Sequence, residues 1–108
     1  MRSPVLLTLV LALGGTSVAC SPRPASPGES VFRSAELRCG NCHRVGGKGG
    51  QKGPPLDKIG AKRDREWLRA SIRDMSLREP GTNMPPFPAE KLPDKDLDIL
   101  VDWLVTLK

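Results

Sequence analysis

Apolar residues recur at helical spacing in three stretches of the chain, residues 29–38, 64–75 and 94–107. In the first stretch Val31 and Phe32 begin the apolar side, and in the others apolar residues return every three or four positions. This spacing is typical of amphipathic helices with one buried face. Nothing in the sequence reads as a β-strand. We therefore expect an all-α protein with three main helices.

Local signals mark helix ends and two loops. Asp64 stands where an N-cap is expected, and acidic residues crowd the first turn of the third stretch, which suits the helix dipole. Residues 46–53 hold five glycines and predict a loop. No Lys-Ser or Lys-Thr pair and no preceding strand accompany it, so a phosphate-binding loop is excluded. Residues 77–88 predict a second loop, rich in proline around Met84.

The first 19 residues have the pattern of a cleavable export signal. Arg2 supplies a positive charge, residues 5–13 form a short apolar run, and Ser17-Val18-Ala19 ends it with small residues. The run is too short to span a bilayer as a permanent helix. We expect cleavage after Ala19 and a mature protein in the bacterial periplasm or cell envelope.

Cys20 directly follows the expected cleavage point and is a candidate lipidation site. Small residues followed by Cys resemble a bacterial lipobox, although Ser17 stands where Leu is most common. Ordinary cleavage is the alternative, and it would leave a reactive thiol exposed. We expect residues 20–28, which include three prolines, to form a lipidated N-terminus and a semi-extended tether. Residues 29–108 then form one domain, anchored to a membrane through lipidated Cys20.

The pentapeptide Cys39-Gly-Asn-Cys42-His43 carries the strongest chemical signal. C-x-x-C-H is the attachment pattern of a c-type haem. On a helical turn both thiols and the imidazole share one face, so the thiols can form thioethers to the haem vinyl groups while His43 binds the iron. A structural zinc site needs four ligands, and the only other Cys or His is Cys20. A redox C-x-x-C belongs in a βαβ pattern, which is absent here. The motif therefore predicts one covalently bound haem c.

A low-spin haem iron needs a second axial ligand, and His43 is the only histidine. Met75 lies on the apolar side of the predicted second helix, where a methionine usually fills the core. Met84 lies between prolines in Pro80-Gly-Thr-Asn-Met-Pro-Pro86, a stiff loop that can hold one side chain in place. A loop methionine covering a hydrophobic patch is the alternative. We expect Met84 to be the second iron ligand.

From about Pro27 to Lys108 the chain resembles a class I cytochrome c. The resemblance rests on residues 28–32, the C-x-x-C-H motif, Gly53-Pro-Pro-Leu56, residues 80–85 and the Leu-Pro-Asp opening of a last helix that contains Trp103. It implies a small fold wrapped around one haem, with the first helix packed across the last.

The resemblance also implies contacts for individual residues. Phe32 would pack against Trp103 or Leu100, and the Pro54 carbonyl would accept a hydrogen bond from the ligating His43. Two departures affect these expectations. Phe32 stands seven residues before Cys39, which is farther than usual and predicts a bulge or extension between them. The chain also has no Tyr, which removes one frequent hydrogen-bonding partner near the methionine ligand and the haem propionates of this family.

Met/His ligation fills both axial positions, so no small-molecule substrate can bind the iron. The expected function is one-electron transfer at a raised reduction potential, by a carrier and not an enzyme. Residues 65–69 and 84–87 are similar to the small haem subunit of thiosulfate-oxidising complexes. A non-catalytic haem subunit of an exported oxidoreductase complex is therefore the alternative. A haem-based sensor, which needs a ligand that readily leaves the iron, is a third reading.

The charge is uneven along a chain whose formal net charge is +5. Residues 38–78 hold eleven Lys or Arg against four Asp or Glu, and residues 79–108 hold three against six. An exported chain does not meet nucleic acid, so we expect none as a partner. The basic excess predicts docking to an acidic surface on a redox protein, or neutralisation of the haem propionates. A solvated surface with no docking role is the alternative.

Overall fold

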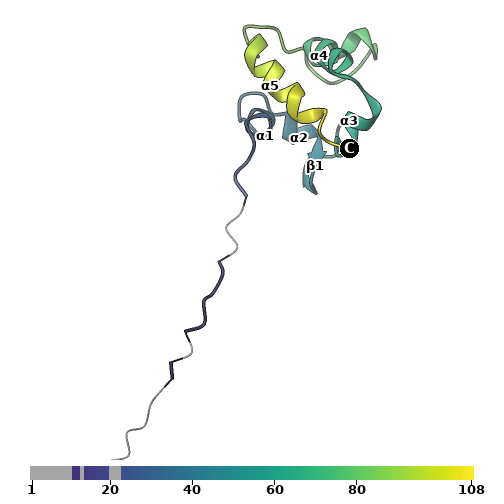
Figure 1. The fold of residues 1–108 in the computed structure, drawn as a ribbon. Helices are drawn as coiled ribbons and strands as arrows, with labels where there is room; N and C mark the ends of the chain where they lie inside the picture. Colours follow the sequence, from purple (N-terminus) through teal and green to yellow (C-terminus); the bar gives the residue numbers. More distant parts are fainter. Residues whose placement is uncertain (1–10, 13, 20–22) are drawn as a thin grey trace, which may run out of the picture.

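The computed structural model describes residues 11–12, 14–19 and 23–108. In chain order its elements are α1 (Pro27–Phe32), α2 (Cys39–Cys42), β1 (Arg44–Val45), β2 (Lys48–Gly49), α3 (Ile59–Lys62), α4 (Arg65–Arg73), the 3-10 helix η1 (Met75–Leu77) and α5 (Asp94–Leu104) (Figure 1). The fold is helical, as the sequence predicts. Within the described residues, no helix is long and apolar enough to cross a membrane.

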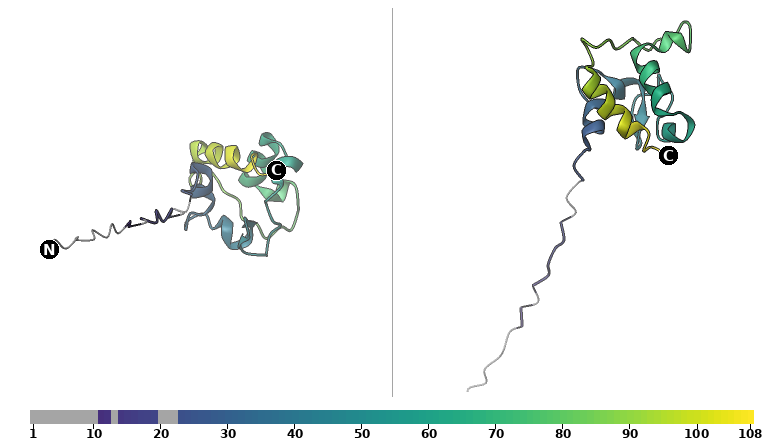
Figure 2. Two further views of the ribbon diagram at one scale, coloured as in Figure 1. Left: turned by 60° about the horizontal axis from the view of Figure 1, so that its bottom comes forward. Right: turned by 45° about the horizontal axis from the view of Figure 1, so that its top comes forward.

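Helix α1 lies against α5, and the two stay together in every view (Figures 1 and 2). Gly28 is buried at this crossing, where a Cβ would collide with Trp103 and lie 2.6 Å from the carbonyl oxygen of Ile99. One turn later, the ring centroids of Phe32 and Trp103 are 5.4 Å apart. The expected packing of the first helix across the last is therefore confirmed, and it depends on a residue without a side chain.

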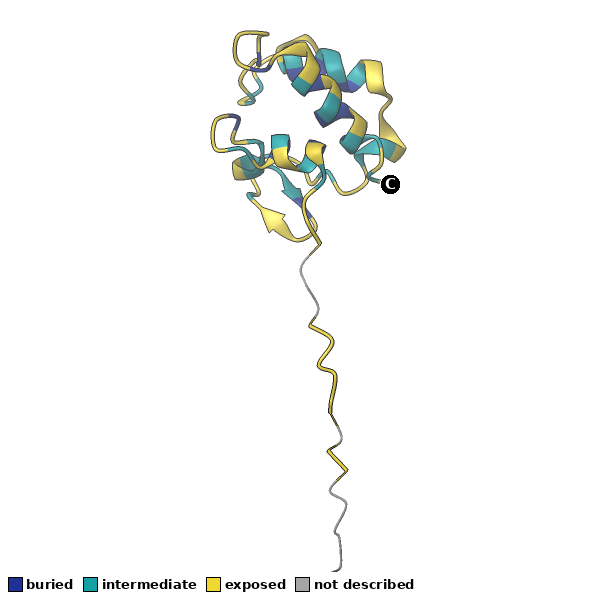
Figure 3. Ribbon diagram, turned by 60° about the vertical axis from the view of Figure 1, so that its left-hand side comes forward, coloured by how far each residue is buried: buried dark blue, intermediate teal, exposed yellow. Residues whose placement is uncertain are grey.

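Helices α4 and α5 supply most of the hydrophobic core. Asp64 caps α4 as predicted, because its carboxylate accepts a hydrogen bond of 2.8 Å from the Trp67 N–H. The buried face of α5 consists of Leu97, Leu100, Val101 and Leu104. The other buried apolar side chains are Phe32, Leu37, Val45, Leu68, Ile72, Phe87 and Leu92. The core thus spans both ends of the folded chain, and Figure 3 shows it along the inner sides of the helices.

The helices are shorter than the sequence pattern predicts. The first ends at Phe32 and not at Arg38, because the chain turns at Ser34, whose hydroxyl accepts a 3.4 Å hydrogen bond from the Leu37 N–H. It also begins at Pro27, two residues inside the segment expected to be a tether. The second helix ends at Arg73 and the last at Leu104, where tighter turns take over.

A short hairpin corrects the expectation that no strand is present. Arg44 pairs with Gly49 and Val45 pairs with Lys48 in an antiparallel register. β2 is exposed (Figure 3). Two residues a strand are too few for an alternating pattern to be visible in the sequence.

Candidate functional site

The C-x-x-C-H motif forms a single helical turn. The His43 N–H donates to the Cys39 carbonyl at 3.0 Å, and the Asn41 N–H donates to the Arg38 carbonyl at 3.0 Å. Arg38 enters this turn in the left-handed region, with φ 56°. Cys39 and Cys42 are free thiols and both are half-buried. The turn therefore holds the two cysteines on one short helix, with His43 as its C-cap.

The imidazole of His43 is held at one nitrogen by the backbone. Its Nδ1 lies 2.8 Å from the carbonyl oxygen of Pro54. Because a carbonyl oxygen can only accept, this contact assigns a proton to Nδ1, so that in the neutral ring Nε2 is the nitrogen with a lone pair for a metal. Neutral imidazole with its other nitrogen bonded to a carbonyl is the form in which histidine binds metals.

Gly53 fixes the same ring by contact. A Cβ at this position would lie 2.6 Å from Cε1 and 2.7 Å from Nδ1 of His43, which is too close for any side chain. The Gly53 N–H also donates to the Cys42 carbonyl at 2.8 Å. The backbone before Pro54 is therefore packed directly on the imidazole.

The rest of the glycine-rich segment lies along the motif. The Gly50 N–H donates to the Gly40 carbonyl at 2.9 Å, and the Leu56 N–H donates to the Arg44 carbonyl at 2.9 Å. The sequence predicts only a loop here and does not predict these hydrogen bonds to the motif. The signal that could have indicated them is the run of five glycines at residues 46–53, directly before Pro54.

Met84 contacts the hydrophobic core from the proline-rich segment between η1 and α5, far in sequence from the motif. It is half-buried and packs against the buried cluster, as does Cys39. Its backbone N–H donates to Thr82 Oγ1 at 3.2 Å. Met75 lies beyond the end of α4, in η1, and belongs neither to the buried cluster nor to the side chains packed on it. The two methionines therefore occupy different surroundings.

The thiol chemistry disfavours a dithiol redox site. Burial raises the pKa of Cys39 from 9.0 to about 11, with a smaller contribution from Cys42. A thiol–disulfide oxidoreductase needs a lowered pKa, because the thiolate is the nucleophile. Among the described residues, no three His, Cys, Asp or Glu side chains gather to hold a metal ion.

The donor set fits a covalently bound haem. It comprises two free thiols, an imidazole whose Nδ1 is hydrogen-bonded to the Pro54 carbonyl, and a thioether on the same core. The Nε of Arg44, next to His43, is buried and has no hydrogen-bond partner within the described part of the chain. A haem propionate is an anion of the kind that would satisfy such a donor. Cys20 lies outside the described residues.

Known proteins provide an independent comparison. The family profile described as cytochrome c oxidase, cbb3-type, subunit III matches residues 23–104. Cytochrome c-551 of Stutzerimonas stutzeri is 29% identical over 106 residues, which cover 95% of this chain and 97% of that protein. A chain in the crystal structure of SoxXA from P. pantotrophus superposes with a TM-score of 0.66 and 26% identity, covering 80% of this chain and 84% of that chain.

The profile match spans most of the chain and includes every element from α1 to α5. It agrees with the helical fold. The chain therefore belongs to the cytochrome c family described as cytochrome c oxidase, cbb3-type, subunit III, and is a class I c-type cytochrome, an electron carrier with one covalently bound haem c.

Proposed function

We propose that this cytochrome transfers one electron at a low-spin haem bound through Cys39 and Cys42, with His43 and Met84 as the axial ligands. The 2.8 Å contact between His43 Nδ1 and the Pro54 carbonyl carries this proposal. It leaves Nε2 as the one ring nitrogen able to bind iron, on a ring that directly follows the second thiol.

When bound, the haem supplies the change between ferric and ferrous iron. The Pro54 carbonyl fixes the orientation of His43 and raises its basicity as a ligand. The soft thioether of Met84 favours ferrous iron more than a second imidazole would, which raises the reduction potential. With His43 and Met84 both holding the iron, the chemistry that the haem would supply is electron transfer without bonding to a substrate.

Met84 is the better candidate of the two methionines for structural reasons. Pro85 and Pro86 follow it directly, and proline fixes φ, so the loop has few conformations in which to carry its sulfur away. Met84 also packs on the core cluster that Cys39 contacts. Met75 sits in a separate 3-10 turn and has neither feature.

Two variants with opposite expected results test the ligand assignment. Met84→Ala should abolish the sulfur-to-ferric-iron absorption band, lower the reduction potential and let carbon monoxide bind the reduced protein. Met75→Leu is nearly isosteric and should preserve the band, with a stability change of about 1 kcal/mol or less. Loss of the band in Met75→Leu with retention in Met84→Ala would reverse the assignment. Free binding of carbon monoxide by the wild type would favour a sensor.

A second candidate function is a haem subunit of an exported oxidoreductase complex, such as a thiosulfate-oxidising complex. The similarity to a chain of SoxXA supports it, because that chain is matched over most of its own length. Size-exclusion chromatography of native extracts distinguishes the two. A tight heteromer favours the subunit, and a free monomer of the mature size favours the soluble or tethered carrier.

We further propose that the redox partner presents an acidic docking surface. Lys48 and Lys52 are exposed in and after the hairpin, and neither forms an ion pair within the described residues. Electron transfer to an acidic redox protein should slow as ionic strength rises. Replacing both lysines by Gln should weaken that salt dependence, whereas the same change at Lys95 and Lys108 should not. Equal effects of both pairs would contradict a local docking surface.

Lipid anchoring through Cys20 remains part of the proposal. Related c-type cytochromes work outside the cytoplasm, and the residues before Cys20 suit signal cleavage. Stable anchoring requires more than one acyl chain. The mature protein should fractionate with membranes, and Cys20→Ala should release it into the soluble exported fraction. Mass spectrometry that finds an unmodified N-terminal cysteine would contradict the anchor.

A further inference from the structure

One side chain at the end of α4 fastens the segment that carries Met84. The Nη1 of Arg73 donates to the carbonyl oxygens of Phe87 at 2.8 Å and Leu92 at 2.6 Å. Its Nη2 donates to Asp94 Oδ1 at 2.5 Å. The backbone adds a further bond, since the Phe87 N–H donates to the Arg73 carbonyl at 3.1 Å. A single residue therefore holds this segment shortly after Met84 and again at its end.

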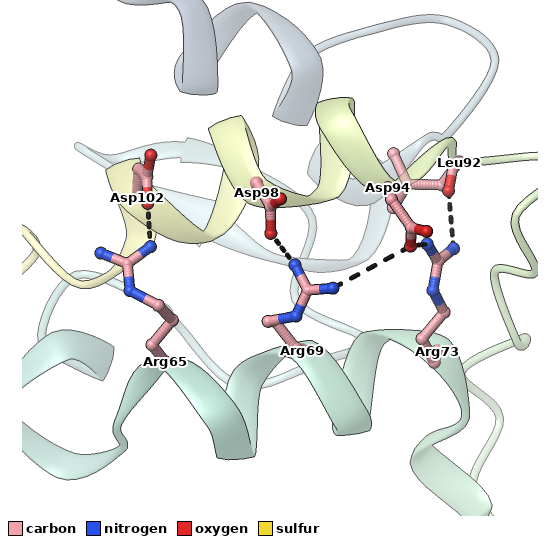
Figure 4. Close-up of polar contacts among 7 residues, drawn as sticks. All are labelled: Arg65, Arg69, Arg73, Leu92, Asp94, Asp98 and Asp102. Atoms are coloured by element: carbon pink, nitrogen blue, oxygen red, sulfur yellow. Dashed lines mark hydrogen bonds and ion pairs between the residues drawn. The ribbon is translucent and has the colours of Figure 1, made fainter.

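Arg73 is also part of a charge ladder between α4 and α5 (Figure 4). Three arginines spaced by four residues face three aspartates with the same spacing, in the pairs Arg65–Asp102, Arg69–Asp98 and Arg73–Asp94. Arg69 also lies 3.9 Å from Asp94, so this carboxylate is shared. The side chain of Arg73 is 25% exposed, against 52% for Arg65 and 35% for Arg69. Of the three, Arg73 alone donates to backbone carbonyls in the described part of the chain.

Because only Arg73 also binds backbone carbonyls within the described residues, we expect it to contribute more to stability than Arg65 or Arg69 does. Exposed ion pairs between flexible side chains contribute little to stability, because water and salt screen them. A guanidinium that donates to two part-buried carbonyls and a carboxylate makes charge-assisted hydrogen bonds, which are stronger than neutral ones. Lysine lacks the planar set of five N–H donors that makes these bonds possible together. Arg73 therefore stabilises the fold mainly through its hydrogen bonds to the Phe87 and Leu92 carbonyls, and less through its ion pair in the charge ladder.

The Phe87 carbonyl that Arg73 binds lies close to Met84 in the sequence, along a stiff stretch of chain. Only Pro85 and Pro86 separate Met84 from Phe87, and both have a fixed φ. Phe87 is itself 5% exposed and part of the core. Because φ is fixed at both prolines, the chain between Met84 and Phe87 has few free torsions, and the bonds between Phe87 and Arg73 restrict how far Met84 can move from the core.

We propose that Arg73 is a positioning residue for Met84. By fixing the backbone at Phe87 and Leu92, it keeps the sulfur in place and makes the sixth iron position resistant to external ligands. This inference rests on the proposed function, in which Met84 is an axial ligand.

The test uses the covalent holoprotein and imidazole as the competing ligand. Ferric protein is titrated with imidazole while the sulfur-to-iron absorption band is followed. Arg73→Met should bind imidazole at least tenfold more tightly than the wild type, since it loses charge-assisted hydrogen bonds that hold the loop. Arg73→Lys should fall between the two. If far-ultraviolet circular dichroism shows that Arg73→Met does not fold, Arg73→Lys serves as the test variant.

Two matched controls remove ion pairs and leave the carbonyl bonds in place. Arg69→Met removes the pair with Asp98 and the longer pair with Asp94, and Asp94→Asn removes the carboxylate that both Arg73 and Arg69 contact. Both should stay within about twofold of the wild type in imidazole affinity. Equal imidazole affinities in Arg73→Met and Arg69→Met would overturn the inference.

Met84→Ala in the same series separates this inference from the proposed function. If Met84→Ala abolishes the band while the Arg73 variants behave like the controls, the positioning role fails and the ligand assignment stands. If Met84→Ala keeps the band, the ligand assignment itself fails, and the role of Arg73 fails with it.

Discussion

Gly53→Ala is expected to damage the haem site through a single added methyl group. The new Cβ would lie 2.6 Å from Cε1, 2.7 Å from Nδ1 and 3.2 Å from Nε2 of His43. Carbon atoms in contact are about 3.5–4.0 Å apart, so the ring or the loop must move by about 1 Å. The ring cannot simply rotate away, because Nδ1 is bonded to Pro54 and Nε2 is the proposed iron ligand.

The magnitude follows from two costs. Overpacking of a well-packed site costs about 1–3 kcal/mol. Loss of the hydrogen bond between His43 Nδ1 and the Pro54 carbonyl adds about 0.5–1.5 kcal/mol. We therefore expect Gly53→Ala to lower the free energy of unfolding by about 1.5–4.5 kcal/mol. The reduction potential should shift as well, because the ligating imidazole changes its orientation and basicity.

Urea unfolding and a redox titration of the covalent holoprotein measure both effects. Gly40→Ala is the matched control within the same motif, since its Cβ would make only an ordinary contact of 3.6 Å with Phe32. Replacing glycine in a helical turn should leave the stability unchanged or raise it by up to about 1 kcal/mol. If Gly53→Ala is as stable as Gly40→Ala and has the wild-type potential, His43 is not held by the backbone as described.

Three further expectations concern the motif and the helix that leads to it. Phe32→Ala removes a side chain that is 1% exposed and should lower the free energy of unfolding by about 3–5 kcal/mol in urea, and a loss below about 1 kcal/mol would place Phe32 outside the core. Arg38, with φ 56°, should tolerate Gly but lose about 1–2 kcal/mol as Val, and equal stability of the two variants would contradict the left-handed conformation. Cys39→Ala combined with Cys42→Ala should yield largely unfolded apoprotein by circular dichroism, because so small a chain would lose the haem surface on which it packs, and a native spectrum would refute this.

The motif turn and the helix crossing were predictable because they depend on local spacing and family resemblance. Cys39 and Cys42 lie on one helical turn, and His43 is its C-cap, bonded through its N–H to the Cys39 carbonyl. Phe32 meets Trp103 as the resemblance implies. The caps of helices are equally local, and Asp64 accepts the hydrogen bond that its position suggests.

The end of the first helix was not predictable from apolar spacing. Ala35 continues the helical pattern after Phe32 but is exposed, because the chain has already turned. The turn places Arg38 in the left-handed region immediately before the motif. Helix propensity is a weak preference that such tertiary requirements override.

The local net charge did not indicate that some of the basic residues pair with acidic residues of α5. The basic excess of residues 38–78 suggests an outward docking role, yet Arg65, Arg69 and Arg73 pair with aspartates of α5. Both series have a spacing of four, so the pattern is visible in the sequence. Which helix faces which is a tertiary fact, and spacing within one helix cannot reveal it.

Covalent attachment of the haem is tested most directly by the intact mass of the purified protein, followed by mass mapping of its proteolytic peptides. We expect one haem per chain, retained after denaturation in acid, on the peptide that contains Cys39, Cys42 and His43. A polypeptide that loses its haem on denaturation, or that carries it on any other peptide, would contradict covalent attachment at this motif.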